Sequence, residues 1–436
     1  MGRREKPKRV TVTIKLNSSL RRFALAAAIL LPGVFFISVV VSHFTIRAIA
    51  DRRINPSLDA LELAARRLPN SPRIQSRLAE AELIGAATKI ERLVDAEGHA
   101  NRAVSLSSWD YRNWRLLALA QESNGKFDEA EKSMLLAVKS APKHVEVNWM
   151  YANLLLRRGK IDESLKPFRV AAGANRELLP IAFELLWRAS DGDLSRLNSL
   201  ADESPQTQLA LANFLVEQSE MDAAIRVFRS VESKARVNSP DAVAFISSLL
   251  EDGQPEIARQ LWLETMIALT GRQNANNQIW NGSFEIDLFK DFNQFDWSIG
   301  LSDYARIGFD KEVAHGGNKS LRVAFAGRDT TKLLGEVRQL IVLKPNASYR
   351  LECYAKAANL VTPEGPRLAI LSEQVVLATS DPVLSDLTDW QYLSIEFKAP
   401  ANLTTASVSI VRIPRFSYDD PTKGIVWFDD FKLTER

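Results

Sequence analysis

The sequence predicts a multidomain chain with a transmembrane helix, an all-α array of helical repeats and a C-terminal all-β sandwich. Three observations predict this order: an uncharged apolar run at 23–44, a 34-residue spacing within 51–272, and period-two alternation within 273–436. The chain has 436 residues, of which 46% are hydrophobic and 25% are charged, so two or three ordinary domains can bury cores.

The apolar run from Phe23 to Phe44 contains no Asp, Glu, Lys or Arg. Its length is about that needed to cross a hydrocarbon core of roughly 30 Å. Residues 1–22 carry eight Lys and Arg against the single acid Glu5, so the positive-inside rule places this leader in the cytoplasm. We therefore expect a single-pass protein of a bacterial inner membrane with its bulk in the periplasm. A nucleic-acid partner is not expected, because these basic residues precede a membrane segment rather than covering a folded face.

A cleaved signal peptide is the alternative for the same segment. Ala48-Ile49-Ala50 resembles a signal-peptidase site, and cleavage after Ala50 would release the rest of the chain. The apolar core and its basic leader are both longer than those of a usual signal peptide. We therefore expect an uncleaved anchor.

A 34-residue spacing organises the region from 51 to 272. Residues 125–130 (GKFDEA) align with residues 159–164 (GKIDES), and Ala118 aligns with Ala152 at the same offset. Small residues let two antiparallel helices approach closely, and a glycine in the turn lets the chain reverse. A half repeat is expected at 58–68 and a shortened unit at 179–204. Full or near-full repeats are expected to begin near Gln75, Tyr111, Val145, Pro205 and Ser239.

These residues resemble the tetratricopeptide (TPR) repeat family. The positions that carry the resemblance are Trp114, Leu117, Ala118, Gly125, Ala130, Ala137 and Pro142. The resemblance implies a solenoid whose concave surface binds peptides or helices of protein partners. The alternative is an array that serves only as a spacer and dimerisation arm.

Composition changes at 271–277, a polar stretch expected to be a linker. Beyond it, short alternating runs separated by turn residues predict the strands of a β-sandwich. The predicted strands are 320–326, 336–343, 349–355, 367–371, 391–398, 406–412 and 425–433.

The landmarks of this region resemble the jelly rolls of carbohydrate-binding modules with a galactose-binding-like fold. They are residues 281–285 (NGSFE), 315–323 (HGGNKSLRV), 343–349 (LKPNASY), Trp390 with 397–400, and 426–433 (VWFDDFKL). The resemblance implies a glycan ligand held by exposed aromatic rings and neighbouring polar groups. The candidates are Phe295, Trp297, Tyr304, Arg412, Phe416 and Tyr418, and packing is the alternative role for these rings. Trp390 and Trp427 are expected in the core.

The same resemblance implies a structural calcium ion near the two ends of the domain. Glu285, Asp429 and Asp430 are the expected ligands, since carboxylate oxygens suit calcium. Strand-end capping is the alternative role for these acids. The single cysteine, Cys353, is expected to be a buried thiol and can form no intramolecular disulfide.

We expect no enzymatic activity. The four histidines are scattered, and the chain contains neither a Gly-x-Ser-x-Gly elbow nor a phosphate-binding glycine loop. The sequence predicts a membrane-anchored adaptor whose repeats bind proteins and whose jelly roll binds glycan, in synthesis or export of a surface polysaccharide. A structural protein–protein scaffold without sugar binding is the alternative. An enzyme would need a pocket with paired carboxylates and perturbed pKa values.

Overall fold

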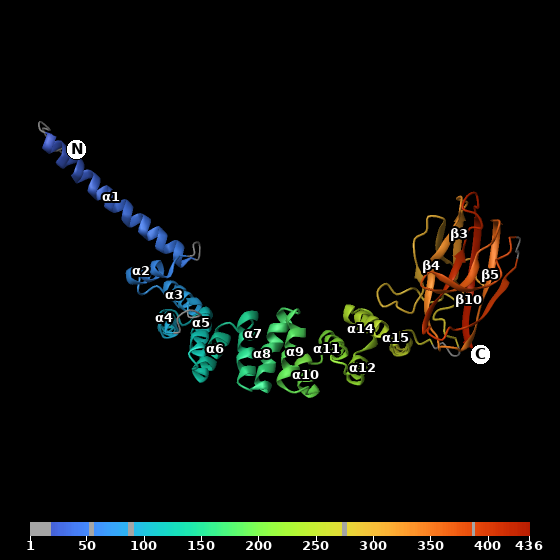
Figure 1. Ribbon diagram of the computed structural model, residues 1–436, viewed down its shortest axis with the longest axis horizontal. Helices are drawn as coiled ribbons and strands as arrows, with labels where there is room; N and C mark the ends of the chain where they lie inside the picture. The colour runs from blue at the N-terminus through green and yellow to red at the C-terminus, as the bar shows by residue number, and fades with distance from the viewer. Residues whose placement is uncertain (1–18, 52–55, 86–90, 273–276, 386–388) are drawn as a thin grey trace, which may run out of the picture. The chain divides into compact units, whose positions relative to one another are not determined.

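The computed structural model describes residues 19–51, 56–85, 91–272, 277–385 and 389–436 (Figure 1). The chain divides into two compact units, Met1–Leu178 with Arg188–Gly192, and Leu179–Trp187 with Asp193–Arg436. Most of the predicted basic leader, residues 1–18, lies outside the described residues, as do residues 273–276 of the predicted linker.

The first helix, α1 (Ser19–Ala50), contains the predicted membrane segment. Among the described residues it is the one helix long and apolar enough to span a membrane, over Arg22–Ile49. A signal sequence near an N-terminus can also pass this test of length and hydropathy. The far end of α1 is packed in the first unit: Ile49 is 3% exposed and lies in a cluster with Leu61, Ile74 and Leu78.

The first unit is built of antiparallel helix pairs, and the repeat boundaries predicted near Gln75, Tyr111 and Val145 are confirmed to within a few residues. Ala118 and Ala130 lie in one buried cluster, as the close approach of paired helices requires. The helices are α2 (Leu58–Arg67), α3 (Pro72–Gly85), α4 (Arg92–Leu106), α5 (Tyr111–Ser123), α6 (Phe127–Ser140), α7 (Val145–Arg157) and α8 (Ile161–Ala174).

A buried amide side chain recurs near the start of each leading helix. Gln75 donates to the carbonyl of Pro69 at 3.1 Å, Asn113 to that of Ser107 at 3.0 Å, and Asn148 to that of Pro142 at 3.0 Å. In each case the acceptor lies six residues upstream, in the turn that precedes the helix. The amide satisfies a carbonyl that no helix bond reaches and fixes where the helix begins.

An ion pair also repeats with the 34-residue period. Lys126 reaches Glu97 of the preceding helix pair at 2.8 Å, and Lys160 reaches Glu131 at 2.6 Å. Both lysines follow a glycine in the left-handed region, Gly125 at φ 75° and Gly159 at φ 72°. The turn therefore directs the lysine back onto the previous repeat.

The second unit begins with further paired helices. Its Ser219, at φ 63°, and Gly253, at φ 71°, occupy the turn position of Gly125 and Gly159. Phe228 stacks on Phe245 at 4.6 Å between ring centroids. The helices are α9 (Leu178–Ala189, at the division between units), α10 (Leu194–Ala201), α11 (Pro205–Glu217), α12 (Met221–Ser230), α13 (Ser233–Val237), α14 (Pro240–Glu251) and α15 (Pro255–Thr270).

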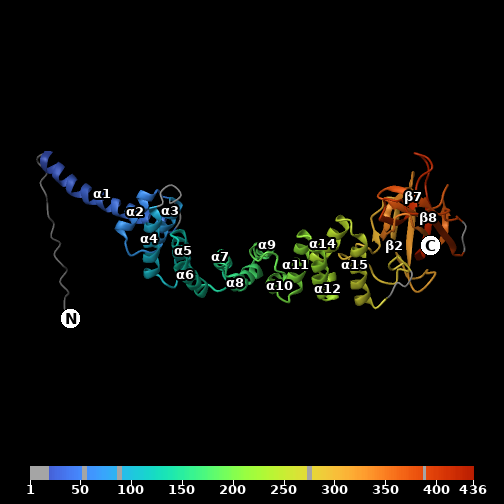
Figure 2. The same cartoon turned by 60° about the horizontal axis from the view of Figure 1, so that its bottom comes forward.

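The C-terminal part is an antiparallel sandwich of two five-stranded sheets, ordered β1-β4-β9-β6-β7 and β2-β3-β10-β5-β8 (Figures 1 and 2). All seven predicted strands are confirmed. Strands β1, β2 and β7 were not predicted, and β1 has only two residues, too few to show a period. The strands are β1 (Ser298–Ile299), β2 (Ala305–Asp310), β3 (Ser320–Ala326), β4 (Leu333–Val342), β5 (Ser348–Val361), β6 (Arg367–Ser372), β7 (Val375–Thr379), β8 (Gln391–Lys398), β9 (Thr405–Arg412) and β10 (Lys423–Glu435).

Four buried rings join helix α15 to the sandwich, and we call them the aromatic joint: Trp262, Trp280, Phe292 and Phe295. Trp262 meets Trp280 edge-on at 5.5 Å and lies parallel to Phe292 at 6.3 Å. Each of the four is at most 2% exposed. The sandwich is therefore packed directly on the last helix.

Candidate functional site

The loop between β9 and β10 is anchored by a fully buried ion pair. Arg412 Nη2 lies 2.6 Å from Asp420 Oδ1, with neither side chain exposed, and Arg412 Nη1 donates to the carbonyl of Thr331. The hydrogen bond from Arg412 lowers the pKa of Asp420, so the carboxylate stays charged. Arg412 was predicted to line a ligand site. The structure corrects this prediction. The buried Arg412 guanidinium holds the loop in place and is not available to a ligand.

Two aromatic rings project from this anchored loop. Phe416 is 54% exposed and Tyr418 71% exposed, with their centroids 6.3 Å apart and their planes at 33°. The half-exposed Arg415 lies beside them and faces Glu364 at 3.9 Å. Adjacent exposed rings next to charged and polar groups are a composition that favours ligand binding over packing.

Two other predicted rings are buried, so they cannot stack on a ligand. Phe295 belongs to the aromatic joint, 5.8 Å from Trp262. Trp297 lies in the sandwich core against Phe431 at 4.8 Å and donates its indole N–H to the carbonyl of Asn281. Both follow a turn-rich segment that looks like an exposed loop in sequence, but the helical array and the core cover it.

Tyr304 is half-buried just before β2. Its carbonyl accepts from the backbone N–H of Ala326, the last residue of β3. Among the described residues, Phe416 and Tyr418 form an aromatic pair with each other and not with Tyr304, so the structure gathers two of the six predicted residues into one exposed group.

An aromatic cluster that the sequence did not single out lies on the outer face of the β2-β3-β10-β5-β8 sheet. His315 stacks on Tyr354 at 3.7 Å, Trp390 meets His315 edge-on at 5.4 Å, and Tyr392 meets Tyr354 at 5.6 Å. Tyr392 is 43% exposed and donates its hydroxyl to Glu352. The alternation within β5 puts Tyr354 opposite the core residue Cys353, so the strand pattern could have identified this face.

Of the two tryptophans expected in the core, Trp427 is buried and Trp390 is not. Trp390 is half-buried within this outer cluster. Trp427 is 7% exposed, but it pairs in register with Arg322 and Lys356 on the outer face, and its indole N–H donates to Asp310. Strand alternation places Trp427 on the face opposite its core neighbours Val426 and Phe428, where it is nevertheless buried, whereas Trp390 precedes β8 and packs in the outer cluster.

The three acids proposed as calcium ligands surround the loop at residues 315–319. Glu285 Oε1 accepts from the backbone N–H groups of Asn318 at 2.6 Å and Lys319 at 2.9 Å. Asp429 Oδ2 accepts from the N–H groups of His315 and Gly316, while Asp430 contacts the His315 ring at 2.7 Å. Burial raises the pKa of Asp429 to about 6.

This arrangement does not fit a metal held by three carboxylates. The oxygens of Glu285 and Asp429 face N–H donors, and within the described ranges no group of three His, Cys, Asp or Glu side chains could hold an ion. A Cβ at Gly317 would lie 2.5 Å from Glu285 Oε1, so the loop backbone sits directly against the carboxylate. What the structure shows is a loop clamp made by carboxylates.

The single cysteine is where the sequence predicted it. Cys353 lies in the core with no exposed surface, and burial raises the pKa of its thiol. A thiol kept protonated in a closed core does not act as a nucleophile or a metal ligand.

Comparisons with known proteins give matches among solved structures. No protein-family profile matches the chain, and no curated protein matches it. One similar structure, described as "CBM4 structure and function", is 18% identical, covers 36% of this chain and 99% of its own, with a TM-score of 0.28. TmCBM61 in complex with β-1,4-galactotriose is 15% identical and covers 37% of this chain and 100% of its own, with a TM-score of 0.23.

The helical part also has a similar solved structure. MamA protein is 12% identical and covers 43% of this chain and 88% of its own, with a TM-score of 0.26. All three TM-scores are below 0.5, so these similarities carry no argument about function. The assignment of two sheets and paired helices therefore rests on the elements of this chain.

Proposed function

We propose that this chain is a membrane-anchored, non-enzymatic adaptor whose sandwich binds a glycan and whose helical repeats bind protein partners. The observation that carries the glycan half is the exposed pair Phe416 and Tyr418 on a loop locked by Arg412 and Asp420. Rings that are both exposed and fixed offer flat apolar faces at little entropic cost.

The chemistry of a pyranose complements this loop. Its C–H face is apolar and suits an aromatic ring, while its hydroxyls suit charged neighbours such as Arg415 and Glu364. The outer cluster around Tyr354 and Tyr392 offers a second aromatic surface on the same domain.

A glycan-binding assay on the full chain in detergent tests the proposal. We expect Phe416→Ala with Tyr418→Ala to lower affinity for a bound polysaccharide at least tenfold, since each stacked ring contributes on the order of 1 kcal/mol. Ile413→Ala, on the same loop and 48% exposed, is the matched control and should have little effect. If the double variant bound the polysaccharide as tightly as wild type, this loop would not be the glycan-binding site.

The anchoring half is supported by the burial of Ile49. Cleavage after Ala50 would remove Ile49 from the cluster with Leu61 and Ile74, and would remove the Ile49 carbonyl that Arg77 bonds at 3.2 Å. A segment that completes the core of the mature fold is poorly suited to removal. We propose that the N-terminus stays cytoplasmic and that the domains face the periplasm. Intact mass and carbonate-resistant membrane association test this, and a mature chain beginning at Asp51 would contradict it.

The repeat array supplies the partner-binding half of the proposal. Exposed charged and apolar side chains follow its helices, including Phe127 at 51% exposure. A place in synthesis or export of a surface polysaccharide is the setting in which both halves would be used together. If wild type binds no polysaccharide but the Phe416 and Tyr418 variant loses a protein partner, the chain is a scaffold without sugar binding.

Calcium binding stays a prediction from the family resemblance. Thermal unfolding with calcium and with chelator tests it. A calcium site would raise the midpoint in wild type and leave Glu285→Gln unresponsive. The clamp seen here makes Glu285→Gln destabilising under both conditions.

A further inference from the structure

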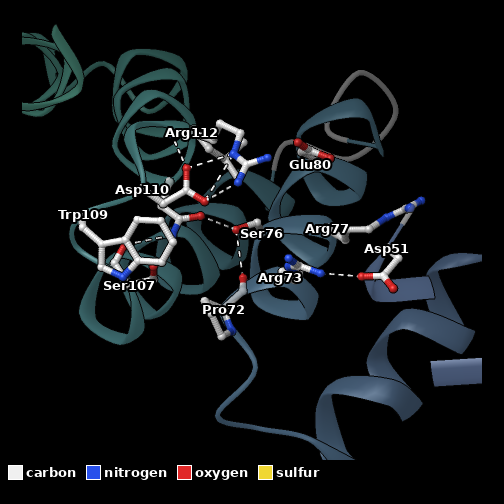
Figure 3. A pocket seen from close by; sticks show the side chains of 12 residues that line it. Asp51, Pro72, Arg73, Ser76, Arg77, Glu80, Ser107, Trp109, Asp110 and Arg112 are labelled. Atoms are coloured by element: carbon white, nitrogen blue, oxygen red, sulfur yellow. Dashed lines mark hydrogen bonds and ion pairs between the residues drawn. The ribbon is translucent and has the colours of Figure 1, made fainter. Parts of the chain in front are cut away.

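Two hollows of the molecule differ in whether their charged groups already have partners. In the hollow beside the end of α1, Arg73 pairs with Asp51 and Arg112 pairs with Asp110, so its charges are matched within the chain (Figure 3). A second hollow, of about 320 Å³, lies against strands β4 and β9 of the sandwich. It contains a buried carboxylate oxygen without a partner among the described residues, so it is the hollow that calls for a ligand.

One loop and two strands of the second unit build this second hollow. Leu340 of β4 pairs in register with Ser407 of β9, and both point away from the core because their neighbours Ile341 and Val408 lie inside it. The loop that leads into β1 covers this part of the sheet. The residues that line the hollow include Asn293, Gln294, Asp296, Arg338, Leu340 and Ser407.

Asp296 is the buried acid of this hollow, with only 2% of its surface exposed. Its Oδ1 accepts the backbone N–H of Trp297 at 2.8 Å, whereas its Oδ2 is buried and has no hydrogen-bond partner in the described ranges. Burial raises the pKa of Asp296 to about 6, and the groups that lower it are backbone N–H groups rather than a cation. A carboxylate buried without a counter-ion is costly, so a ligand that brings a cation to it is favoured.

The neighbouring amides add further acceptors. Gln294 donates its Nε2 to the carbonyl of Val243 at 3.2 Å, which fixes the orientation of the amide and leaves its buried Oε1 without a donor. Asn293 likewise donates its Nδ2 to the carbonyl of Lys290 at 3.2 Å, so its Oδ1 remains an acceptor. The ligand must therefore supply several hydrogen-bond donors, and a primary ammonium carries three donors and no acceptor.

The β4 side of the hollow asks for different chemistry. Arg338 is exposed, no acid of the described part of the chain pairs with it, and its guanidinium can only donate. A group beside the ammonium must therefore accept, as a hydroxyl does. The half-buried Leu340 suits an apolar C–H face. The volume lies at the small end of ligand sites, which hold roughly 300–1,000 Å³, and fits a single ring.

We propose that this hollow binds an amino sugar, a sugar unit whose free primary ammonium lies beside a hydroxyl. The ammonium donates to Asp296 and Gln294, and the hydroxyl accepts from Arg338. A lysine side chain would bring an ammonium but no acceptor for Arg338. The inference goes beyond the glycan site proposed at Phe416 and Tyr418 and does not rest on it, because the loop of those rings follows the far end of β9 from Ser407.

The test uses the full chain in detergent at pH 7 and three methyl glycosides that differ at one position. Methyl glucosaminide carries an amine there, methyl N-acetylglucosaminide an acetamide, and methyl glucoside a hydroxyl. Titration followed by ligand-observed NMR measures each affinity. We expect methyl glucosaminide to bind at least tenfold more tightly than the other two, because its charge-assisted hydrogen bonds reach a buried carboxylate. Butylamine, an ammonium without a ring, should bind at least tenfold more weakly than methyl glucosaminide.

Variants separate the two sides of the site. Asp296→Asn keeps the shape of the side chain and removes its charge, so it should lower affinity for methyl glucosaminide at least tenfold and abolish the preference over methyl glucoside. Asp287→Asn is the matched control, since the Asp287 side chain is 91% exposed and does not line the hollow. Arg338→Gln, at an exposed position that tolerates change, should weaken methyl glucosaminide and leave butylamine unaffected.

Equal affinities of wild type for the three glycosides, or equal effects of Asp296→Asn and Asp287→Asn, would overturn the proposal. Butylamine binding as tight as that of methyl glucosaminide would also overturn it and would identify a site for a bare ammonium such as a lysine side chain. Phe416→Ala with Tyr418→Ala should leave methyl glucosaminide binding unchanged. If wild type prefers methyl glucosaminide but the loop variant keeps full affinity for polysaccharide, the proposed loop site fails and this inference stands.

Discussion

The indole N–H of Trp262 donates to the backbone carbonyl of Phe292 at 3.2 Å, and the two rings lie 6.3 Å apart and 13° from parallel. One residue belongs to the last helix and the other to the segment that leads into the sandwich. Arg259 adds a bond from the same helix to the carbonyl of Gln278, and Gln294 bonds the carbonyl of Val243. The sandwich and the end of the array therefore support each other.

Truncating Trp262 should destabilise the second unit. Trp262→Ala removes a fully buried ring and leaves a cavity, a change that costs about 3–5 kcal/mol. Chemical denaturation of the full chain in detergent measures the loss. Trp109→Ala, a 79% exposed tryptophan, is the control and should change the free energy of unfolding by no more than about 0.5 kcal/mol. Similar effects of both changes would show that the joint does not contribute to stability.

Breaking the buried ion pair between Arg412 and Asp420 should lower the free energy of unfolding more than breaking an exposed ion pair does. Asp420→Asn leaves Arg412 charged and buried without a counter-ion, at a cost of about 3–5 kcal/mol. Glu264→Gln, which breaks a half-exposed pair with Arg229, should cost about 1 kcal/mol or less. Urea unfolding compares the two. The loop rings should also lose their fixed position, so glycan affinity should fall with Asp420→Asn.

The pKa of Asp420 also predicts a response to acid. Because the folded-state pKa is below the ordinary value, the pair stabilises the fold above about pH 4 and this stabilisation is lost as the pH falls through the folded pKa. The difference between wild type and Asp420→Asn should therefore shrink at low pH. A difference that stays constant from pH 7 to pH 3 would contradict this.

Asp296 should have the opposite dependence on pH. Burial raises its pKa to about 6, and its Oδ2 has no hydrogen-bond partner among the described residues. A raised acid pKa means that the folded state binds the proton more tightly, so stability falls as the pH rises from about 4 to 6. The loss is on the order of 3 kcal/mol. Unfolding measured across this range should show a smaller slope in Asp296→Asn than in wild type.

Ser219 offers a stabilising change. It adopts φ 63° at the turn where Gly125, Gly159 and Gly253 stand in other repeats. A residue with a Cβ costs roughly 1 kcal/mol or more in this region, so Ser219→Gly should raise the free energy of unfolding by about 1 kcal/mol. The reverse change, Gly253→Ser, should lower it by a similar amount. A destabilising Ser219→Gly would show that its side chain has a role that the backbone does not reveal.

The helices and most strands could be predicted from short-range sequence patterns, because turn geometry and side-chain alternation depend on residues that are close in the sequence. The 34-residue offset that aligned Gly125 with Gly159 reflects one turn geometry used twice, and both glycines are in the left-handed region. Alternation predicted seven strands because side chains on a strand point to opposite faces. The same local signal missed β1, β2 and β7, of which β1 has only two residues and shows no period.

The apolar first helix, the helix pairs and the β-sandwich were predicted from sequence alone, through length, period and turn composition. The sequence also named Phe416 and Tyr418 as candidates, but only the structure shows that both rings are exposed. Only the tertiary structure decided that Arg412 is sealed with Asp420, that Phe295 closes on Trp262, and that Trp390 faces outward. Burial is a property of what packs from elsewhere in the chain, and no local pattern specifies that partner.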